Sequence, residues 1–229
     1  MSDEYKTTAV LFSGGLDSAV LVAERAREGP VVAIYVSVGF AWEAEERAMI
    51  QRLFAAPPLA GVVAPPVELS FDMRDVFSPA HWAVKGTPPA FDTPDEDVYL
   101  PGRNVILLSK ATAWLAARAT PAPVRIFMGQ LGGNPFPDAT PEFLAAMARA
   151  LSLGLAMPLA IETPFASMHK AAVIRKGVEL GVPLELTLSC MQPRDGLHCG
   201  ECSKCRERRD AFAEAHVEDP TRYARQPLR

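Results

Sequence analysis

Short apolar runs alternate with helical patterns along the first two thirds of the chain. The runs at residues 8–12 and 31–38 are rich in β-branched residues and nearly continuous in apolarity, which is typical of strands buried on both faces of a parallel sheet. Further strands are expected within residues 62–71 and at residues 124–128. Helices are expected at residues 17–28, 43–55, 104–119, 141–152, 170–181 and 203–216. This order predicts an α/β fold, a three-layer sandwich in which helices cover both faces of a mostly parallel sheet.

Two segments add to this pattern. Residues 104–119 are apolar on nearly all sides, so we expect the helix there to be buried. Residues 72–100 are rich in proline and acidic residues, which predicts a long loop. Loops of this length in a compact domain usually act as lids or binding segments.

Composition and charge narrow the class of protein. The chain has 229 residues, 49% hydrophobic and 22% charged, which fits one large domain or one domain with a small appendage. Its net charge is -4, whereas proteins that bind nucleic acid usually carry a basic excess, so a nucleic-acid partner is not expected. The N-terminal residues include acids where a secretory signal would be basic, and no apolar stretch has the length of a membrane span. We expect a cytoplasmic protein with no membrane partner.

The first predicted strand runs into the sequence SGGLDS, where a helix begins. Gly14 and Gly15 let the backbone approach a ligand closely, and the helix N-terminus presents unpartnered N–H groups that favour an anion. Ser13 and Ser18 add hydroxyl donors, and Asp17 can hold a metal ion that bridges phosphates. The motif is neither a Walker A loop nor G-x-G-x-x-G. We expect a phosphate site here; the alternative is an ordinary turn in which Asp17 or Ser18 only caps the helix.

All four cysteines, Cys190, Cys199, Cys202 and Cys205, lie close together near the C-terminus. In a reducing compartment such crowding is poorly explained by disulfides. Four thiolates suit a tetrahedral Zn²⁺ ion, and a site filled by four sulfurs would be structural. The alternatives are an iron–sulfur cluster or four unrelated buried cysteines. We expect a zinc site that attaches the C-terminal helical region to the rest of the chain.

These two motifs carry a resemblance to a known family. Ser-Gly-Gly-Leu-Asp-Ser resembles the PP-loop of the N-type ATP pyrophosphatases, and Ser-Cys…Cys-Gly-x-Cys-x-x-Cys-Arg far downstream resembles the 7-cyano-7-deazaguanine synthases (QueC, also called ExsB). The resemblance runs from about residue 8 to residue 223. Four further stretches are similar to that family: YLPGRN at 99–104, FPDATPEF at 136–143, ETPFASMHKAAVI at 162–174 and DPTRY at 219–223.

The resemblance implies a fold and a reaction. The fold would be Rossmann-like, of the adenine nucleotide alpha hydrolase kind, with a PP-loop ATP pyrophosphatase domain at 1–185 and a zinc-binding region at 186–229. The enzyme would be a carbon–nitrogen ligase using ATP and Mg²⁺. It would adenylate 7-carboxy-7-deazaguanine, form the amide with ammonia, and convert the amide to 7-cyano-7-deazaguanine (preQ0) with a second ATP, in queuosine biosynthesis. A homodimer is implied as well. The nucleotide contacts would fall on Ser13, Gly14, Gly15, Leu16, Asp17, Ser18 and Asn104.

Two basic residues lie at predicted helix starts. Arg103 precedes Asn104, the expected N-cap of one helix, and Lys170 begins another. A cation there opposes the helix dipole by roughly 0.3–1 kcal/mol, which makes sense if an anion is shared. We expect Arg103 and Lys170 to contact ATP or pyrophosphate and to act in catalysis with Asp17. The alternative is a solvated surface cation at each position.

Other basic residues are expected at the surface. His169 replaces a threonine of the family, and we favour a cap or a surface residue over an acid–base role. Four cations of the last predicted helix are expected to form a solvated face, with an RNA-contacting patch as the alternative: Lys204, Arg206, Arg208 and Arg209.

The segment 129–140 departs from the family. The family carries acidic residues there and Cys-Arg after its aspartate, whereas this chain reads QLGGNPF and then has Ala139-Thr140 after Asp138. Asp138 and Glu142 remain as the carboxylates expected to contact the substrate. Losing the acids and the arginine changes the hydrogen-bonding chemistry of the substrate pocket.

Three alternatives to the synthase reaction stay open. The first is a paralogue that amidates or nitrilates a different small carboxylate. A tRNA-modifying PP-loop enzyme would need a tRNA-binding surface, which the acidic balance disfavours, and a free catalytic cysteine. A non-catalytic, zinc-containing regulator would have no need of a phosphate loop. The ammonia is expected to come from free ammonium or a separate donor.

Overall fold

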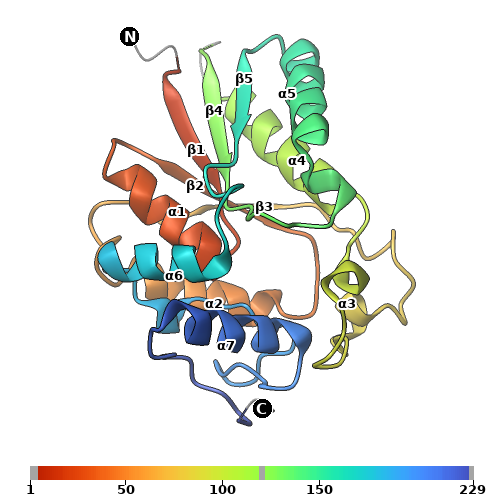
Figure 1. Cartoon of the computed structure of the whole chain (residues 1–229). Helices are drawn as coiled ribbons and strands as arrows, with labels where there is room; N and C mark the ends of the chain where they lie inside the picture. The colour runs from red at the N-terminus through yellow and green to blue at the C-terminus, as the bar shows by residue number, and fades with distance from the viewer. Residues whose placement is uncertain (1–4, 119–121, 227–229) are drawn as a thin grey trace.

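A parallel sheet of five strands forms the centre of the computed structural model, which describes residues 5–118 and 122–226 (Figure 1). The strands lie in the order β3-β2-β1-β4-β5, and each neighbouring pair is parallel. Their bounds are β1 (Thr7–Leu11), β2 (Val32–Ser37), β3 (Val67–Ser70), β4 (Val124–Met128) and β5 (Leu159–Glu162). The order reverses between β1 and β4, and in such sheets ligands bind beyond the carboxyl ends of the strands at that point.

Within the described residues, seven α-helices connect and flank the strands. They are α1 (Leu16–Ala26), α2 (Glu43–Phe54), α3 (Trp82–Lys85), α4 (Arg103–Ala116), α5 (Pro141–Leu155), α6 (Lys170–Glu179) and α7 (Ser203–Ala215). Short 3-10 helices lie at Asp95–Val98, Pro137–Ala139 and Leu184–Leu186. The longest helix, α5, has 15 residues, and within the described ranges no helix is long and apolar enough to cross a membrane.

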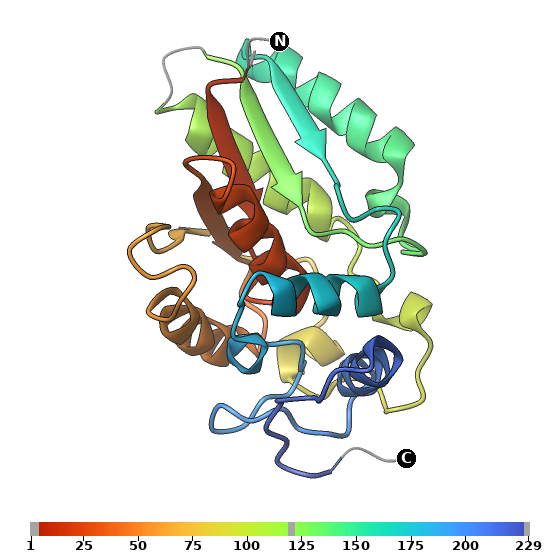
Figure 2. The ribbon, with the colours of Figure 1, turned by 60° about the vertical axis from the view of Figure 1, so that its left-hand side comes forward.

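Alternate residues of the central strands face opposite sides of the sheet. Val10 and Tyr35 pack in one hydrophobic cluster with α1, α2 and α6, whereas Ala9 and Ile34 pack in another with α4 and α5. Figure 2 shows α1 in front of the sheet and α4 and α5 behind it. The three-layer α/β sandwich predicted from the sequence is therefore confirmed.

A third hydrophobic cluster lies beyond the carboxyl end of the sheet. It combines buried residues of 38–42, of 72–100 and of the cysteine-rich region. The prediction of a long loop at residues 72–100 is only partly right, because this segment contains α3 and the 3-10 helix Asp95–Val98. Figure 1 shows α3 and α7 on this side of the molecule, where α7 also packs against α6. The division of the chain at residues 185 and 186 stays a prediction.

Two expectations about α4 are wrong. Asn104 is not the N-cap: α4 begins at Arg103, after Gly102 with the left-handed φ of 77°. The helix is also not buried all round, because its buried residues form one stripe: Leu108, Ala111, Thr112 and Leu115. Ala119, the last residue of the predicted helix, lies outside the described residues. The sequence pattern also does not predict β5, since four residues are too few to show a period.

Candidate active site

The segment SGGLDS, residues 13–18, is called the phosphate loop here because the sequence predicts that it binds phosphate. It connects β1 to α1 at the carboxyl end of the sheet. Gly15 is the N-cap of α1 and makes no side-chain cap, so the N–H groups of the first helical turn lack an intrahelical acceptor. Gly14 has a φ of 73°, and a Cβ there would lie 2.9 Å from Cγ1 of Ile50, so the position requires glycine. The loop thus presents backbone donors at a helix N-terminus, as an anion requires.

Hydrogen bonds hold the loop in this shape. Ser13 and Ser18 place their hydroxyl oxygens 3.2 Å apart, and the Ser18 hydroxyl donates to the carbonyl of Gly15 at 3.0 Å. The carbonyl of Gly14 accepts a hydrogen bond from the backbone N–H of Leu188 at 2.9 Å. The segment before the first cysteine is therefore attached directly to the phosphate loop.

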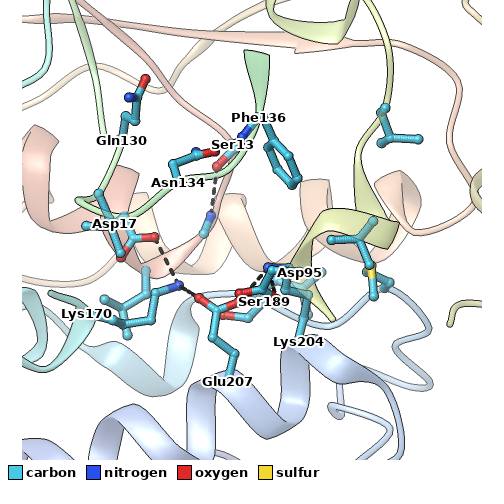
Figure 3. Close-up of a pocket in the computed structure, with 18 of the residues that line it drawn as sticks. Ser13, Asp17, Asp95, Gln130, Asn134, Phe136, Lys170, Ser189, Lys204 and Glu207 are labelled. Atoms are coloured by element: carbon cyan, nitrogen blue, oxygen red, sulfur yellow. Dashed lines mark hydrogen bonds and ion pairs between the residues drawn. The ribbon is translucent and has the colours of Figure 1, made fainter. Parts of the chain in front are cut away.

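Two adjoining cavities open beside the loop, and Figure 3 shows residues that line the first of them. The first, with a volume of about 370 Å³, lies between the loop, residues 129–136 and the C-terminal region. The second, of about 210 Å³, lies over the ends of β1, β2 and β4. Eight residues line both cavities: Ser13, Gly15, Asp17, Glu46, Arg103, Gly129, Gln130 and Asn134. These shared residues form the junction of the two cavities.

Charged side chains of alternating sign cross the first cavity. Lys170 lies between two carboxylates, with its Nζ 3.2 Å from Asp17 and 2.6 Å from Glu207 (Figure 3). Glu207 also pairs with Lys204 at 2.6 Å, and Lys204 reaches Asp95 at 3.3 Å. The chain of ion pairs brings together α1, α6, α7 and the 3-10 helix Asp95–Val98.

The ion pairs set the charge states of these groups. Burial raises the pKa of Asp17, and the nearby Lys170 offsets this only in part. Burial opposes the charge of Lys170, but the carboxylates of Asp17 and Glu207 together raise its pKa above the ordinary value. Burial likewise opposes the charge of Glu207, but Lys170 and Lys204 lower its pKa to about 2. Lys170 is therefore a fixed cation beside the phosphate loop, and Glu207 a fixed anion behind it.

Three buried polar atoms in the cavity walls have no partner among the described residues: Oδ1 of Asp17, Nε of Arg103 and Oε1 of Gln130. Buried polar groups are normally hydrogen-bonded, so unpartnered ones in a cavity wall fit a site where a ligand supplies the contact. Magnesium prefers carboxylate oxygens and phosphates. Asp17 fits a role as ligand of Mg²⁺ on a bound nucleotide, and Arg103 fits contact with an anion.

The four cysteines form a buried cluster at the start of α7. The Sγ atom of Cys202 lies 3.5 Å from that of Cys205 and 4.0 Å from that of Cys190, and Cys199 lies 3.8 Å from Cys205. All four sulfurs lie within 4.8 Å of one another. Backbone N–H groups of residues 192, 199 and 201 also point at these sulfurs. The cluster could hold a metal ion.

The predicted solvated face of α7 is wrong for Arg208. Its side chain is 1% exposed and donates to the hydroxyls of Thr187 (2.9 Å), Ser189 (3.2 Å) and Thr221 (2.6 Å) and to the carbonyl of Leu184 (2.7 Å). A buried guanidinium that donates hydrogen bonds to four acceptors has a structural role. It fixes α7 to the segment that reaches the phosphate loop.

The other three cations of that set contact the segment 90–95. Cys202 at the N-terminus of α7 also forms an isolated β-bridge with Ala90. The three contacts are Lys204 with the Asp95 carboxylate, Arg206 with the Thr93 carbonyl at 3.1 Å, and Arg209 over the Phe91 ring at 5.1 Å. The basic residues of α7 therefore bind the long 72–100 segment.

The remaining predicted residues lie at different distances from the two cavities. Asp138 is buried, and its Oδ2 accepts a hydrogen bond from the backbone N–H of Asn104 at 3.1 Å. Asn104 lines the second cavity, so Asp138 stands behind it and lines neither cavity. Glu142 is exposed in the first turn of α5 and also lines neither cavity. His169 is the exposed N-cap of α6 and makes no capping hydrogen bond through its side chain.

Sequence reasoning missed several residues of the cavity walls. Glu46, Asp95 and Glu207 line the first cavity, although none of them belongs to a motif, and Lys204, which was expected on a solvated face, lines it as well. Trp42, Trp82 and Phe136 form an aromatic wall, in which the two tryptophan rings stack with centroids 5.8 Å apart. The one available signal was a lone acid, Glu207, among the cations of α7.

Comparison with known proteins decides the family. The model of a family described as "Queuosine biosynthesis protein QueC" matches residues 7–216. The chain belongs to the QueC family. Its resemblance to that family, stated from the motifs, is confirmed. Members of the QueC family are ATP-using enzymes, which agrees with the phosphate loop of this chain.

Individual relatives cover nearly the whole chain. A 7-cyano-7-deazaguanine synthase of Methanoculleus marisnigri is 37% identical over 96% of this chain and all of that protein. A 7-cyano-7-deazaguanine synthase of Anaeromyxobacter dehalogenans is 36% identical over 98% of each chain. A solved structure described as a predicted subunit of tRNA methyltransferase, from Methanocaldococcus jannaschii, is 14% identical with a TM-score of 0.41 over 76% of this chain and 75% of that chain.

Proposed function

We propose that this QueC-family protein is a 7-cyano-7-deazaguanine synthase. It would join ammonia to 7-carboxy-7-deazaguanine at the expense of ATP, as a carbon–nitrogen ligase of queuosine biosynthesis. The observation that carries the proposal is the phosphate loop with Asp17 and Lys170 at the point where the strand order reverses. It is supported by relatives of that name at 37% and 36% identity over nearly the full length.

The nucleotide would lie across the second cavity and the phosphate loop. The ends of β1 and β2, with Tyr35 and Val36, would surround the adenosine, and Ser13–Ser18 would hold the phosphates through the N–H groups of the first turn of α1. Asp17 would bind the Mg²⁺ ion that travels with ATP. Lys170 and Arg103 would neutralise the phosphate charge.

The chemistry needs two rounds of adenylation at one site. A substrate carboxylate oxygen attacks the α-phosphorus of ATP, and pyrophosphate leaves. Ammonia then attacks the acyl adenylate, and AMP leaves to give the amide. A second ATP adenylates the amide oxygen, and loss of AMP leaves the nitrile. Lys170, which the two carboxylates keep charged, stabilises the leaving pyrophosphate in each round.

The first cavity would hold the deazaguanine ring. Trp42, Trp82 and Phe136 line it and offer aromatic faces to a flat heterocycle. Gln130 and Asn134 can both donate and accept hydrogen bonds at the ring edge.

A second candidate is the same chemistry on a different small carboxylate. It is favoured by the lack of acidic residues in 130–136 and by the engagement of Asp138 with Asn104. The aspartate and glutamate expected at the substrate, Asp138 and Glu142, line neither cavity, so their contact with substrate stays a prediction. A tRNA-modifying enzyme is less well supported, because all four cysteines lie in one cluster.

We further propose that the cysteines bind one Zn²⁺ ion. With Zn–S bonds of about 2.3 Å, a tetrahedral site has sulfurs about 3.8 Å apart. The three distances of 3.5, 3.8 and 4.0 Å support such a site. In an iron–sulfur cluster the thiolates bind different irons and would be spread further apart. All four ligands come from the region 186–229, so the ion would hold that region together around the start of α7.

Three further proposals rest on the resemblance. The protein would be cytoplasmic, would act as a homodimer, and would take ammonia from free ammonium or a separate donor. Gel filtration with light scattering tests the oligomeric state, and a comparison of ammonium with glutamine tests the nitrogen source.

The proposed function is tested with the purified protein, ATP, Mg²⁺, ammonium and 7-carboxy-7-deazaguanine. We expect AMP and pyrophosphate to appear only with the carboxylate present, and the nitrile to form with two AMP released for each. Other small aromatic carboxylates serve as comparators. Substrate-dependent AMP with one of these alone would support the second candidate, and no turnover with any carboxylate would overturn both.

A further inference from the structure

Glu46 is a buried carboxylate at the junction of the two cavities. It lies in α2, is 7% exposed, and lines both the first cavity and the second, where the nucleotide would lie. Of the eight residues shared by the two cavities, Asp17 and Glu46 are the two that carry a carboxyl group. In an adenylation reaction, bonds are made and broken where nucleotide and substrate meet, so this junction is the place for a reacting group.

The two carboxylates of the junction differ in their partners. Asp17 forms an ion pair with Lys170, so protonating it would break that pair. Glu46 accepts a hydrogen bond from the neutral Tyr35 hydroxyl at 2.6 Å and, among the described residues, takes part in no ion pair. Glu46 can therefore gain and lose a proton without breaking the ion pair that holds Lys170 beside the phosphate loop.

Neighbouring groups and burial together set the pKa of Glu46. Burial raises its pKa to about 7, although the Tyr35 hydroxyl from β2 and the Arg103 guanidinium from α4 lower it. Glu43 and Arg47 on its own helix act in opposite directions, and Asp17 of α1 lines the same cavities. A carboxylate that titrates near neutral pH is well matched to proton transfer in catalysis.

We propose that Glu46 is the general base of the nitrogen-transfer steps, which deepens the proposed function and rests on it. In the first round Glu46 takes a proton from ammonium. The freed lone pair attacks the carbonyl carbon of the acyl adenylate, the carbon–oxygen bond to AMP breaks, and a second nitrogen proton leaves with the AMP phosphate. In the second round one N–H proton of the amide leaves with pyrophosphate as the oxygen is adenylated, and Glu46 takes the other as the carbon–oxygen bond to AMP breaks, which leaves the nitrile. The proton on Glu46 passes to solvent between rounds.

Partial reactions of Glu46→Gln separate this role from ATP binding. Carboxylate-dependent exchange of labelled pyrophosphate into ATP reports adenylation, which needs no ammonia. We expect exchange to fall less than about 3-fold, whereas amide formation with ammonium falls about 10²-fold or more. Hydroxylamine is a nucleophile that is largely neutral at pH 7, so hydroxamate formation should be restored toward wild type. The matched control, Glu45→Gln on the same helix, should retain both reactions.

Tyr35→Phe provides a second variant with a different signature. It removes a hydrogen bond that favours the charged form of Glu46, so the acid limb of kcat/KM should move to higher pH by about one unit relative to wild type. An unshifted limb overturns the proposal, as does a Glu46→Gln variant that loses exchange and ammonium transfer equally. Failure of the wild type to catalyse exchange would instead overturn the proposed function.

Discussion

The phosphate loop and the four-cysteine cluster both lie at the N-terminus of a helix, yet they are built in opposite ways. The loop before α1 is open: its backbone donors at the helix start and Oδ1 of Asp17 have no partner in the part of the chain that the structure describes. The cluster before α7 is closed: its cysteines are at most 2% exposed, and nearby N–H groups already point at the sulfurs. The first arrangement suits a ligand that comes and goes, and the second suits an ion that stays.

The two regions are nevertheless connected. Glu207 lies on α7, two residues beyond the last cysteine, and pairs with Lys170 at the phosphate loop. Arg208, its neighbour, ties α7 to the segment whose Leu188 bonds to Gly14. The closed region thus supports the open one, and substitutions in each should have different signatures.

Cys202→Ser should have the largest effect. Losing one of four thiolates should release the metal and lower the free energy of unfolding by more than about 4 kcal/mol, because metal binding is folding energy in such a site. Elemental analysis and urea unfolding measure the two effects. Met191→Leu, a volume-conserving change in the same hydrophobic cluster, should keep the metal and cost less than about 1.5 kcal/mol. A metal-free Cys202→Ser protein of wild-type stability would contradict the closed, structural site.

Asp17→Asn should affect activity without unfolding the protein. We expect AMP formation to fall at least about 10²-fold, because the carboxylate that would hold Mg²⁺ on the phosphates is gone. The free energy of unfolding should change by less than about 1 kcal/mol, since the substitution removes a buried charge together with its ion pair. Asp75→Asn, at an exposed carboxylate that lines neither cavity, is the control. Full activity of Asp17→Asn would place the phosphate site elsewhere.

Glu207→Gln should show how strongly the two regions depend on each other. Lys170 would then pair with Asp17 alone, and we expect kcat/KM for ATP to fall about 10-fold. Steady-state AMP release at several ATP concentrations measures this. Glu201→Gln, an exposed carboxylate near the cysteines that pairs with Arg225, should leave activity unchanged. An equal effect of the two variants would mean that Glu207 has no special link to the phosphate loop.

The same variant should change acid stability. Because Lys170 and Lys204 lower the pKa of folded Glu207 to about 2, its ion pairs contribute fully above the ordinary glutamate pKa and are lost as pH falls toward 2. Between about pH 5 and pH 2 the wild type should lose on the order of 2 kcal/mol more stability than Glu207→Gln. Urea unfolding at stepped pH measures the difference, and parallel curves would contradict it.

Glu142→Gln should have the smallest effect. The exposed side chain lines neither cavity, so kcat/KM for the carboxylate should change less than about 2-fold. Asp138→Asn should cost more, because it weakens the hold on Asn104 at the start of α4. A large loss in Glu142→Gln would mean that α5 meets the substrate after all, as the sequence alone predicts.

The sequence predicts the parts of the site that are contiguous. SGGLDS and the cysteine cluster are short motifs whose residues lie close together in the sequence. The glycines at a helix start and the thiolates at metal-ligand spacing can therefore be recognised without knowing the fold. Lys170 is also found, because helix starts can be read locally. Glu46 and Asp95 are not, since only the packing of α2 and of the 72–100 segment over the sheet brings them to the cavities.

Local reading also fails where one residue decides a boundary or a face. Asn104 looks like an N-cap, but the N-cap is Gly102, in a left-handed turn two residues earlier. Arg208 looks like its basic neighbours on α7, but four acceptors from elsewhere in the fold surround its guanidinium. In both cases the folded structure gives the residue a role that differs from the one its local sequence suggests.

The pair of cavities has a consequence for a reaction that consumes ATP twice. AMP and pyrophosphate must depart and fresh ATP must enter while the half-finished amide is still needed. Since the nucleotide and the ring would occupy adjoining cavities that meet at one junction, spent nucleotide can be exchanged while the amide stays in its own cavity. Such an enzyme would work processively, and free amide would not accumulate in the medium during turnover.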